Sequence, residues 1–230
     1  MTVLLQNAQL LFFPSAASAY NFGNQHFDAR SGYEYDIDRA ESLYQEALRI
    51  DPQFPYARHQ LARISFLRGD FKSALVLINE ELFTNPDPSP SSYYIRGLIE
   101  GYAGRYDDAA KSYERYLERD PRNWAAINDY AWVLLRAGRS EDAAIATAEG
   151  LAYFPENPWL LNSNATALFE LGLTKEASAV IQKAGESAAS ITEPMWLTAY
   201  PGNDPRIARQ GIETLQRAIA SNKLRFADPE

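Results

Sequence analysis

Residues that could carry catalysis or bind a metal are few in this sequence. Its 230 residues include two histidines, His26 and His59, and no cysteine. The lack of cysteine excludes disulfides, thiolate zinc sites and cysteine nucleophiles. The two histidines lie 33 residues apart with no thiol to join them, which argues against a zinc site or a catalytic pair. The sequence therefore predicts no cofactor, no metal site and no catalytic residue.

The remaining motifs with chemical meaning have structural explanations. The sequence has no glycine-rich phosphate loop, nucleophile-elbow serine or H-E-x-x-H pair. Asp36 and Asp38 look like a paired-carboxylate metal site, but a helix is expected to begin there, and aspartate favours that position as a cap. Asn164-Ala165-Thr166 matches a glycosylation sequon but falls inside an expected helix. We therefore do not expect an enzyme.

Composition and charge narrow the class of partner. Hydrophobic residues make up 46% of the chain and charged residues 23%, which is typical of globular proteins. The net charge of −8 argues against nucleic-acid binding, which requires a basic surface. The absence of cysteine fits both the cytoplasm and a bacterial envelope, so localisation stays open between these two.

The apolar segment 1–18 precedes the rest of the pattern. Three amides interrupt its run of apolar residues and Pro14 ends it, so it is too short and too polar for a spanning helix of about 20 residues. Ala17-Ser18-Ala19 resembles a signal cleavage site, but no Lys or Arg precedes Arg30. A packed helix, a truncated membrane junction and a signal peptide are the alternatives, and membrane contact is expected only through this segment.

An eighteen-residue phrase recurs three times: GDFKSALVLINEELFTNP (69–86), GRYDDAAKSYERYLERDP (104–121) and GRSEDAAIATAEGLAYFP (138–155). A period of 34 residues suits a helix–turn–helix unit stacked on copies of itself. Glycine suits the tight turn inside the unit, proline ends its second helix, and small residues allow the two helices to approach closely. The periodic residues are Gly69, Gly104, Gly138 and Gly172; Pro52, Pro86, Pro121 and Pro155; Ala74, Ala109, Ala143 and Ala177; and Ala62, Gly97, Ala131 and Ala165.

This pattern resembles the tetratricopeptide repeat family, whose signature is W-x2-L-G-x2-Y, then A-x3-F, then P. The third unit carries it in Tyr93, Gly97, Ala109, Tyr113 and Pro121, and the second, fourth and fifth units match in register. The resemblance covers residues 19–189 and implies an all-α, right-handed α-solenoid. We expect five repeats, at 19–54, 55–89, 90–123, 124–157 and 158–189, followed by a loop and a C-terminal capping helix in 190–230.

The first repeat departs from the family pattern by an insertion. Seventeen residues separate Gly23 from Ala40, where the other units have twelve. The extra residues fall in RSGYEYD, so Tyr33 and Tyr35 are expected to be exposed on a loop. This loop is either a tolerated insertion or an additional contact surface for a partner.

The segment after the repeats is expected to cover the last hydrophobic face of the solenoid. Residues 191–205 are predicted to form a loop, and Pro205–Asn222 a helix capped by Asp204. The predicted packing involves Ile207, Ile212, Leu215 and Ile219 on the buried stripe of that helix, with Met195, Trp196 and Tyr200 beneath it.

In this family the first helix of each repeat lines a concave groove that binds extended peptides or partner helices. Large aromatic side chains beside amides suit a peptide, because they offer apolar area together with hydrogen bonds for a backbone. Carried over residue by residue, the resemblance places in the groove Tyr56, His59, Arg63, Tyr94, Leu98, Tyr102, Asn128, Asp129, Trp132, Asn162, Ser163 and Thr166. Packing between neighbouring repeats is the alternative for each single aromatic residue.

We expect a non-catalytic scaffold that binds a peptide or protein segment, whose identity the sequence leaves open together with the oligomeric state. The lysines of chaperone-tail clamps are missing from the groove positions, so that specific ligand is not expected. Arg96 and Glu100 occupy slots that are usually apolar, and an i,i+4 ion pair is the simplest account. The alternative function is a structural one, as the soluble tail of a larger bacterial membrane or envelope assembly protein.

Overall fold

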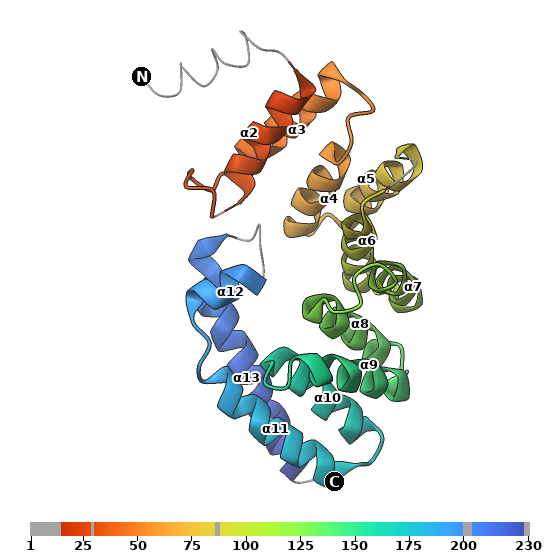
Figure 1. The fold of residues 1–230 in the computed structure, drawn as a ribbon, viewed down its shortest axis with the longest axis vertical. Helices are drawn as coiled ribbons and strands as arrows, with labels where there is room; N and C mark the ends of the chain where they lie inside the picture. Colours follow the sequence, from red (N-terminus) through yellow and green to blue (C-terminus); the bar gives the residue numbers. More distant parts are fainter. Residues whose placement is uncertain (1–14, 29, 86–87, 200–203, 228–230) are drawn as a thin grey trace. The chain divides into compact units, whose positions relative to one another are not determined.

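The computed structural model describes residues 15–28, 30–85, 88–199 and 204–227, and this part of the chain folds into helices without a strand. Figure 1 shows them as a series of short rods joined by tight connections. In chain order they are α2 (Ala16–Phe27), α3 (Ile37–Ile50), α4 (Ala57–Leu67), α5 (Phe71–Thr84), α6 (Pro90–Tyr102), α7 (Tyr106–Leu117), α8 (Trp124–Arg136), α9 (Ser140–Tyr153), α10 (Pro158–Glu170), α11 (Thr174–Ala188), α12 (Glu193–Ala199), a 3-10 turn η1 (Pro205–Ile207) and α13 (Ala208–Ala227).

Successive helices form hairpins whose turns use the periodic glycines. Gly69, Gly104, Gly138 and Gly172 all have positive φ, between 75° and 78°, a conformation that costs glycine little because it has no Cβ. The alanines of the pattern are all fully buried, among them Ala62 and Ala74 within one hairpin. The spacing of these residues in the sequence thus reports the turn and the contact line of each hairpin.

The helices divide into two compact units. The first holds residues 1–99 and 200–205, and the second holds residues 100–199 and 206–230, so the division falls within α6. In the first unit, buried Ala62, Ala74 and Ile78 pack with Ile95 and Ile99 of α6.

The inserted loop of the first repeat is held to α2. His26, buried at the end of that helix, contacts the carbonyl oxygen of Glu34 through Nδ1 at 3.1 Å. Asp36 caps α3 by accepting a hydrogen bond from the Arg39 amide, as predicted for the acidic pair. Tyr33 is exposed as predicted. The same prediction for Tyr35 is wrong, because its half-buried ring packs against the hydrophobic cluster around Phe27.

The close approach of α2 and α3 depends on Gly23. A Cβ at this position would lie 2.5 Å from Cε1 of Tyr44, and Tyr44 is itself fully buried. The Tyr44 hydroxyl donates to Oδ1 of Asn24 at 2.8 Å, which satisfies the polar end of a buried ring. Gly23 therefore fills the small-residue slot of the first repeat for a steric reason.

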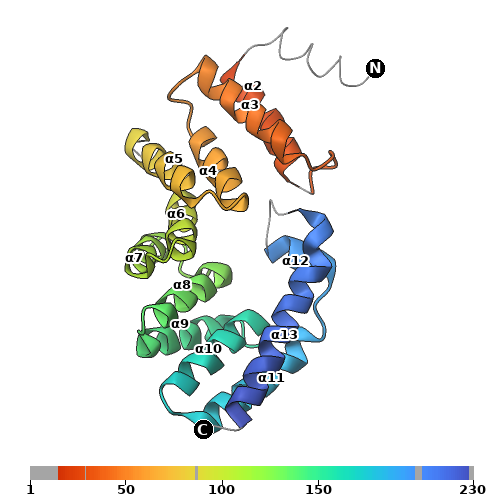
Figure 2. The ribbon, with the colours of Figure 1, turned by 180° about the vertical axis from the view of Figure 1, so that it is seen from behind.

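The C-terminal region differs from the prediction in its helix boundaries and in part of its packing. The expected loop contains helix α12, and α13 begins at Ala208 after a 3-10 turn and extends five residues beyond Asn222. Figures 1 and 2 show α13 lying along α11. Ile219 is buried on α13 as predicted, whereas Ile207 is 42% exposed, because it lies in the 3-10 turn, out of phase with the helix. Phe226, which was not predicted, is buried at the other end of α13.

The side chains expected beneath the last helix have different positions. Trp196 is buried and lies so close to Gly211 that a Cβ there would be 2.3 Å from its Nε1. Met195 is exposed, so its predicted packing is wrong, since adjacent residues of a helix such as α12 point about 100° apart and Trp196 takes the buried direction. Tyr200 lies outside the described residues, as do residues 1–14 of the apolar N-terminal segment. Residues 15–18 of that segment cap and begin α2.

Candidate binding site

The first helix of each hairpin carries the predicted groove residues. Those of the first unit are on α4 and α6, where they recur at intervals of three or four residues and so share one helix face. Those of the second unit are at the end of α6 and on α8 and α10.

On α4, His59 is buried, and its Nδ1 lies 3.0 Å from the Ser92 hydroxyl of α6. Burial disfavours the imidazolium and lowers the pKa of His59 to about 3, with a smaller contribution from the positive charge of Arg63. His59 is therefore neutral at physiological pH. Its contact with Ser92 joins two consecutive first helices.

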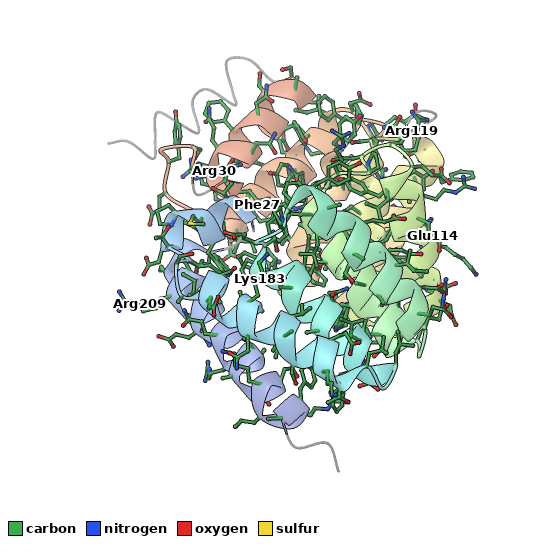
Figure 3. The ribbon with its side chains drawn as sticks, turned by 60° about the horizontal axis from the view of Figure 1, so that its bottom comes forward. Phe27, Arg30, Glu114, Arg119, Lys183 and Arg209 are labelled. Atoms are coloured by element: carbon green, nitrogen blue, oxygen red, sulfur yellow. The ribbon has the colours of Figure 1, made fainter. Side chains whose placement is uncertain are left out.

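Arg63 directs its guanidinium toward α2. It donates to Oε1 of Gln60 at 2.8 Å, and its Cζ lies 4.6 Å from the centroid of the Phe27 ring, labelled in Figure 3. This is a cation–π contact, and burial lowers the pKa of the guanidinium. Tyr94 and Leu98 of α6 are half-buried, and Tyr94 packs against the hydrophobic cluster of α4 and α5.

Tyr56, the other candidate of this unit, precedes α4 in an unusual conformation. Its φ is +67°, which few residues other than glycine adopt. Its amide donates to Oε1 of Glu81 at 2.8 Å. Because α4 has no capping hydrogen bond from the side chain of its own N-cap residue, Glu81 of α5 satisfies the amide at this helix end.

In the second unit an aromatic cluster is formed by Tyr102, Tyr106 and Trp132. The Trp132 ring centroid is 5.1 Å from that of Tyr102 and 6.3 Å from that of Tyr106. Gly101 makes room for it, since a Cβ there would be 2.7 Å from Cζ3 of Trp132. Arg136 donates to the Tyr106 hydroxyl. Tyr102 is 57% exposed, so this part of the cluster lies at the surface of the unit.

The polar candidates of the second unit pair with one another or with α13. Ser163, which is buried, donates to Oδ1 of Asn128 at 2.8 Å, and the Asn128 amide nitrogen donates to half-buried Asp129. Asn162 accepts a hydrogen bond from the side chain of Asn222 at 3.0 Å. These bonds occupy part of the hydrogen-bonding capacity that a peptide would need. Within the described residues, the amide nitrogen of Asn162 has no acceptor, so it stays able to donate. Asn222 also approaches Thr166 Oγ1 at 3.4 Å.

Sequence reasoning missed the partners in these pairs, although a signal was present. Asn24, His59, Asn128 and Asn162 follow the repeat period, and each bonds to the next first helix or to α13 through Gln60, Ser92, Ser163 or Asn222. A polar residue recurring at one repeat position predicts such a pair. Glu100, a charged residue at a repeat position that is usually apolar, accepts a hydrogen bond from Ser112 at 2.6 Å.

Two other kinds of site are absent from the described residues. No group of three or more His, Cys, Asp or Glu side chains there is placed to hold a metal ion. No helix in the same part of the chain has the length and apolar character needed to cross a membrane. Asn164 of the sequon is buried and donates to the Thr147 hydroxyl at 2.9 Å, in keeping with a packing role.

Comparison with known proteins identifies the repeats. Tetratricopeptide repeat family models match residues 33–93 and 96–158, which together make up more than half of the chain. The chain belongs to the tetratricopeptide repeat family, and the predicted fold class, an α-solenoid of such repeats, is confirmed. Membership makes it a scaffold for protein–protein interaction, and proteins of this family are in general non-catalytic.

Individual relatives are distant. The DnaJ homolog subfamily C member 7 homolog of Schizosaccharomyces pombe is 23% identical over 206 residues, or 83% of this chain, and the chain spans 40% of that protein's length. A MamA crystal structure is 20% identical with a TM-score of 0.64, covering 76% of this chain and 92% of its own. YrrB, described as a TPR protein with an unusual peptide-binding site, is 15% identical with a TM-score of 0.66. The match covers 80% of this chain and 92% of the YrrB chain. At these identities the solved structures support the fold alone.

Proposed function

We propose that this chain is a non-catalytic scaffold that binds a peptide or partner segment on the first helices of its repeats. The observation that carries the proposal is the 57% exposure of Tyr102, whose ring packs against Trp132. Aromatic side chains held rigidly by their neighbours contribute most to protein recognition, because they bury large apolar areas at small entropic cost.

The surroundings of the cluster support a peptide ligand. The amide nitrogen of Asn162, without an acceptor among the described residues, is available to donate to a peptide carbonyl. YrrB, a TPR protein with the same fold, is described as having a peptide-binding site. Its site supports a peptide ligand for this chain by analogy. His59 and Ser163 are buried, so we assign them to contacts between helices and propose Tyr102, Asn128, Trp132 and Asn162, all in the second unit, as the residues that meet the ligand.

A matched pair of tyrosines tests the proposal. Tyr102 is 57% exposed on a first helix, and Tyr153 is 53% exposed on the second helix α9, so neither substitution to alanine removes a buried ring. Peptides selected from a random linear library on the wild-type protein should bind Tyr102→Ala at least about tenfold more weakly, or about 1.4 kcal/mol. They should bind Tyr153→Ala with unchanged affinity.

Titration of the selected peptides by fluorescence anisotropy measures both affinities, with circular dichroism to verify the fold. Equal affinity for all three proteins, or an equal loss in both variants, places recognition elsewhere and refutes the proposal. Selection of no peptide refutes it as well.

A further inference from the structure

A buried carboxylate in the first unit lacks the positive partner that burial normally requires. Glu81 of α5 is 1% exposed. Among the described residues, the Tyr56 amide is its only hydrogen-bond donor, at 2.8 Å, and no cation pairs with it. Buried carboxylates are usually paired, because removing a charge from water without compensation is costly. No Lys, Arg or His occurs among the residues outside the described part.

The repeat itself does not demand a charge at this position. The equivalent residues, each five before the proline position of its unit, are Ala47, Tyr116, Gly150 and Ala184. In the fourth repeat this position leaves so little space that a Cβ on Gly150 would lie 3.1 Å from Cγ2 of Ile127. Glu81 therefore places a carboxylate where the other repeats have small or neutral side chains. Its oxygen satisfies the Tyr56 amide, but a neutral acceptor would do the same, so the fold does not explain the charge.

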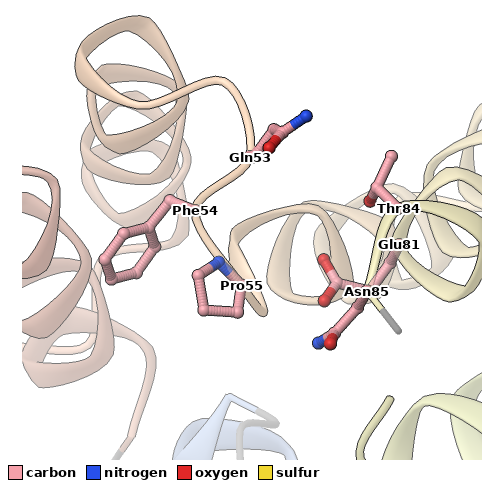
Figure 4. Close-up of a pocket in the computed structure, with 6 residues that line it drawn as sticks. All are labelled: Gln53, Phe54, Pro55, Glu81, Thr84 and Asn85. Atoms are coloured by element: carbon pink, nitrogen blue, oxygen red, sulfur yellow. The ribbon is translucent and has the colours of Figure 1, made fainter. Parts of the chain in front are cut away.

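A cavity opens beside this carboxylate. Its volume is about 230 Å³, room for several groups of the size of water, which takes about 30 Å³ in the liquid. Figure 4 shows the Glu81 carboxylate directed across it toward Pro55. The lining residues are Gln53, Phe54, Pro55, Glu81, Thr84 and Asn85. All of them belong to the first unit.

The polarity of the cavity is suited to a cation. Its Thr84 and Asn85 stand at the C-terminal end of α5, the negative end of a helix dipole. The last turn of α5 contains no basic residue, although basic residues are favoured there. The Thr84 hydroxyl donates to the Glu80 carbonyl at 2.7 Å, which leaves its oxygen lone pairs able to accept from a ligand.

Backbone strain occurs at the same place. Tyr56 follows Pro55 with φ at +67°. Among the non-glycine residues that the structure describes, Tyr56 alone has a positive φ. Such strained conformations cluster at ligand sites. The strain turns the Tyr56 amide toward one oxygen of Glu81 and so fixes the carboxylate in the cavity wall.

We propose that this cavity binds an alkylammonium or guanidinium group, supplied by a Lys or Arg side chain of a protein partner. The bound cation compensates the charge of Glu81 and donates to its carboxylate. The aliphatic part of the partner's side chain contacts Pro55. The site is distinct from the proposed peptide surface, and its test does not depend on that surface.

Single-residue probes test the site in the full chain. N-acetyl-lysine amide and N-acetyl-arginine amide are titrated by two-dimensional NMR, followed at the amides of Gln53, Thr84 and Asn85. N-acetyl-norleucine amide is the uncharged control, and alaninamide reports whether an α-ammonium is bound instead. We expect saturable shifts with at least one cationic side-chain probe and none with norleucine.

Two substitutions on α5 form a matched pair. Glu81→Gln keeps an oxygen acceptor for the Tyr56 amide but removes the charge, and should weaken binding at least tenfold. Glu80→Gln removes an equal charge from the neighbouring exposed residue and should leave binding unchanged. Thr84→Trp, at an exposed position, should fill the cavity and abolish binding even if Glu81→Gln does not fold.

The results separate the alternatives. Equal shifts with lysine and norleucine probes, unchanged binding by Glu81→Gln, or no shift with any probe overturn the proposal. Binding of alaninamide alone overturns the assignment to a side chain and identifies a partner's N-terminus as the source. Tyr102→Ala should leave probe binding intact, so failure of the peptide surface and failure of this cavity are distinguishable.

Discussion

At the scale of single residues, buried polar groups set how the protein responds to acid. His59 is neutral in the fold, with a pKa lowered to about 3 mainly by burial, while an unfolded chain binds a proton at His59 below about 6.5. The unfolded state therefore takes up more protons between these values. The contribution of His59 is fully present above about pH 6.5 and is lost as the pH falls toward about 3.

We predict that the free energy of unfolding decreases by up to about 1.4 kcal/mol per pH unit through His59 over that window. His59→Gln, which keeps a polar group near Ser92 but does not titrate, should show a shallower decrease. Urea denaturation at a series of pH values compares the two proteins. Parallel pH profiles would show that His59 is not the responsible group.

Glycines at helix contacts give a second prediction at this scale. Gly23→Ala should destabilise the protein by about 1–3 kcal/mol, because its Cβ would meet the buried ring of Tyr44 at 2.5 Å. Gly185→Ala, in the last turn of α11, comes close only to the flexible end of Lys223 and should be neutral or stabilising by up to about 1 kcal/mol. Chemical denaturation of both variants measures the difference, and equal effects would contradict the packing argument.

At the scale of secondary-structure elements, α13 completes the second unit. Phe226 stacks on Phe169 of α10 with ring centroids 4.5 Å apart, and its carbonyl accepts from Ser178 of α11. Arg225 pairs with Glu170 at 2.6 Å. The end of α13 thus joins both helices of the last repeat, which is the role expected of a capping helix.

Neighbouring residues of α13 provide a matched test of that role. Phe226 is 1% exposed, whereas Leu224 is 76% exposed. Phe226→Ala should lower the stability by about 3–5 kcal/mol, and Leu224→Ala should change it by less than about 0.5 kcal/mol. Thermal or urea denaturation measures both, and a small effect of Phe226→Ala would mean that α13 is not required as a cap.

At the scale of the whole molecule, contacts are mainly between elements that are close in the chain. The contacts of α2 are chiefly with α3, and those of α11 with α10 and α13. In such repeat proteins stability is approximately a sum over repeats and nearest-neighbour interfaces. Local substitutions should therefore change local opening rather than the stability of every helix equally.

Hydrogen exchange followed by mass spectrometry tests this expectation. Gly23→Ala should increase exchange in α2, α3 and α4, and Phe226→Ala should do so in α10, α11 and α13. Each variant should leave the other set within error of wild type under native conditions. A uniform increase in both sets would instead indicate a single cooperative unit.

The sequence by itself determined the repeat, because turn glycines, helix-ending prolines and buried alanines are local requirements that recur every 34 or 35 residues. It also predicted the capping role of Asp36, since capping depends on a few adjacent residues. The boundaries of α13 and the presence of α12 were predicted incorrectly, because packing against Phe169 and Gly211 decides them.

The tertiary structure alone decided which candidate side chains are buried and which are exposed. Burial and pairing across helices remove His59 and Ser163 from the surface and use one acceptor of Asn128, whereas Tyr102 is 57% exposed. It also revealed the uncompensated carboxylate of Glu81. These properties depend on contacts between residues 25 to 60 positions apart, and helical periodicity specifies only which face of its own helix a residue occupies.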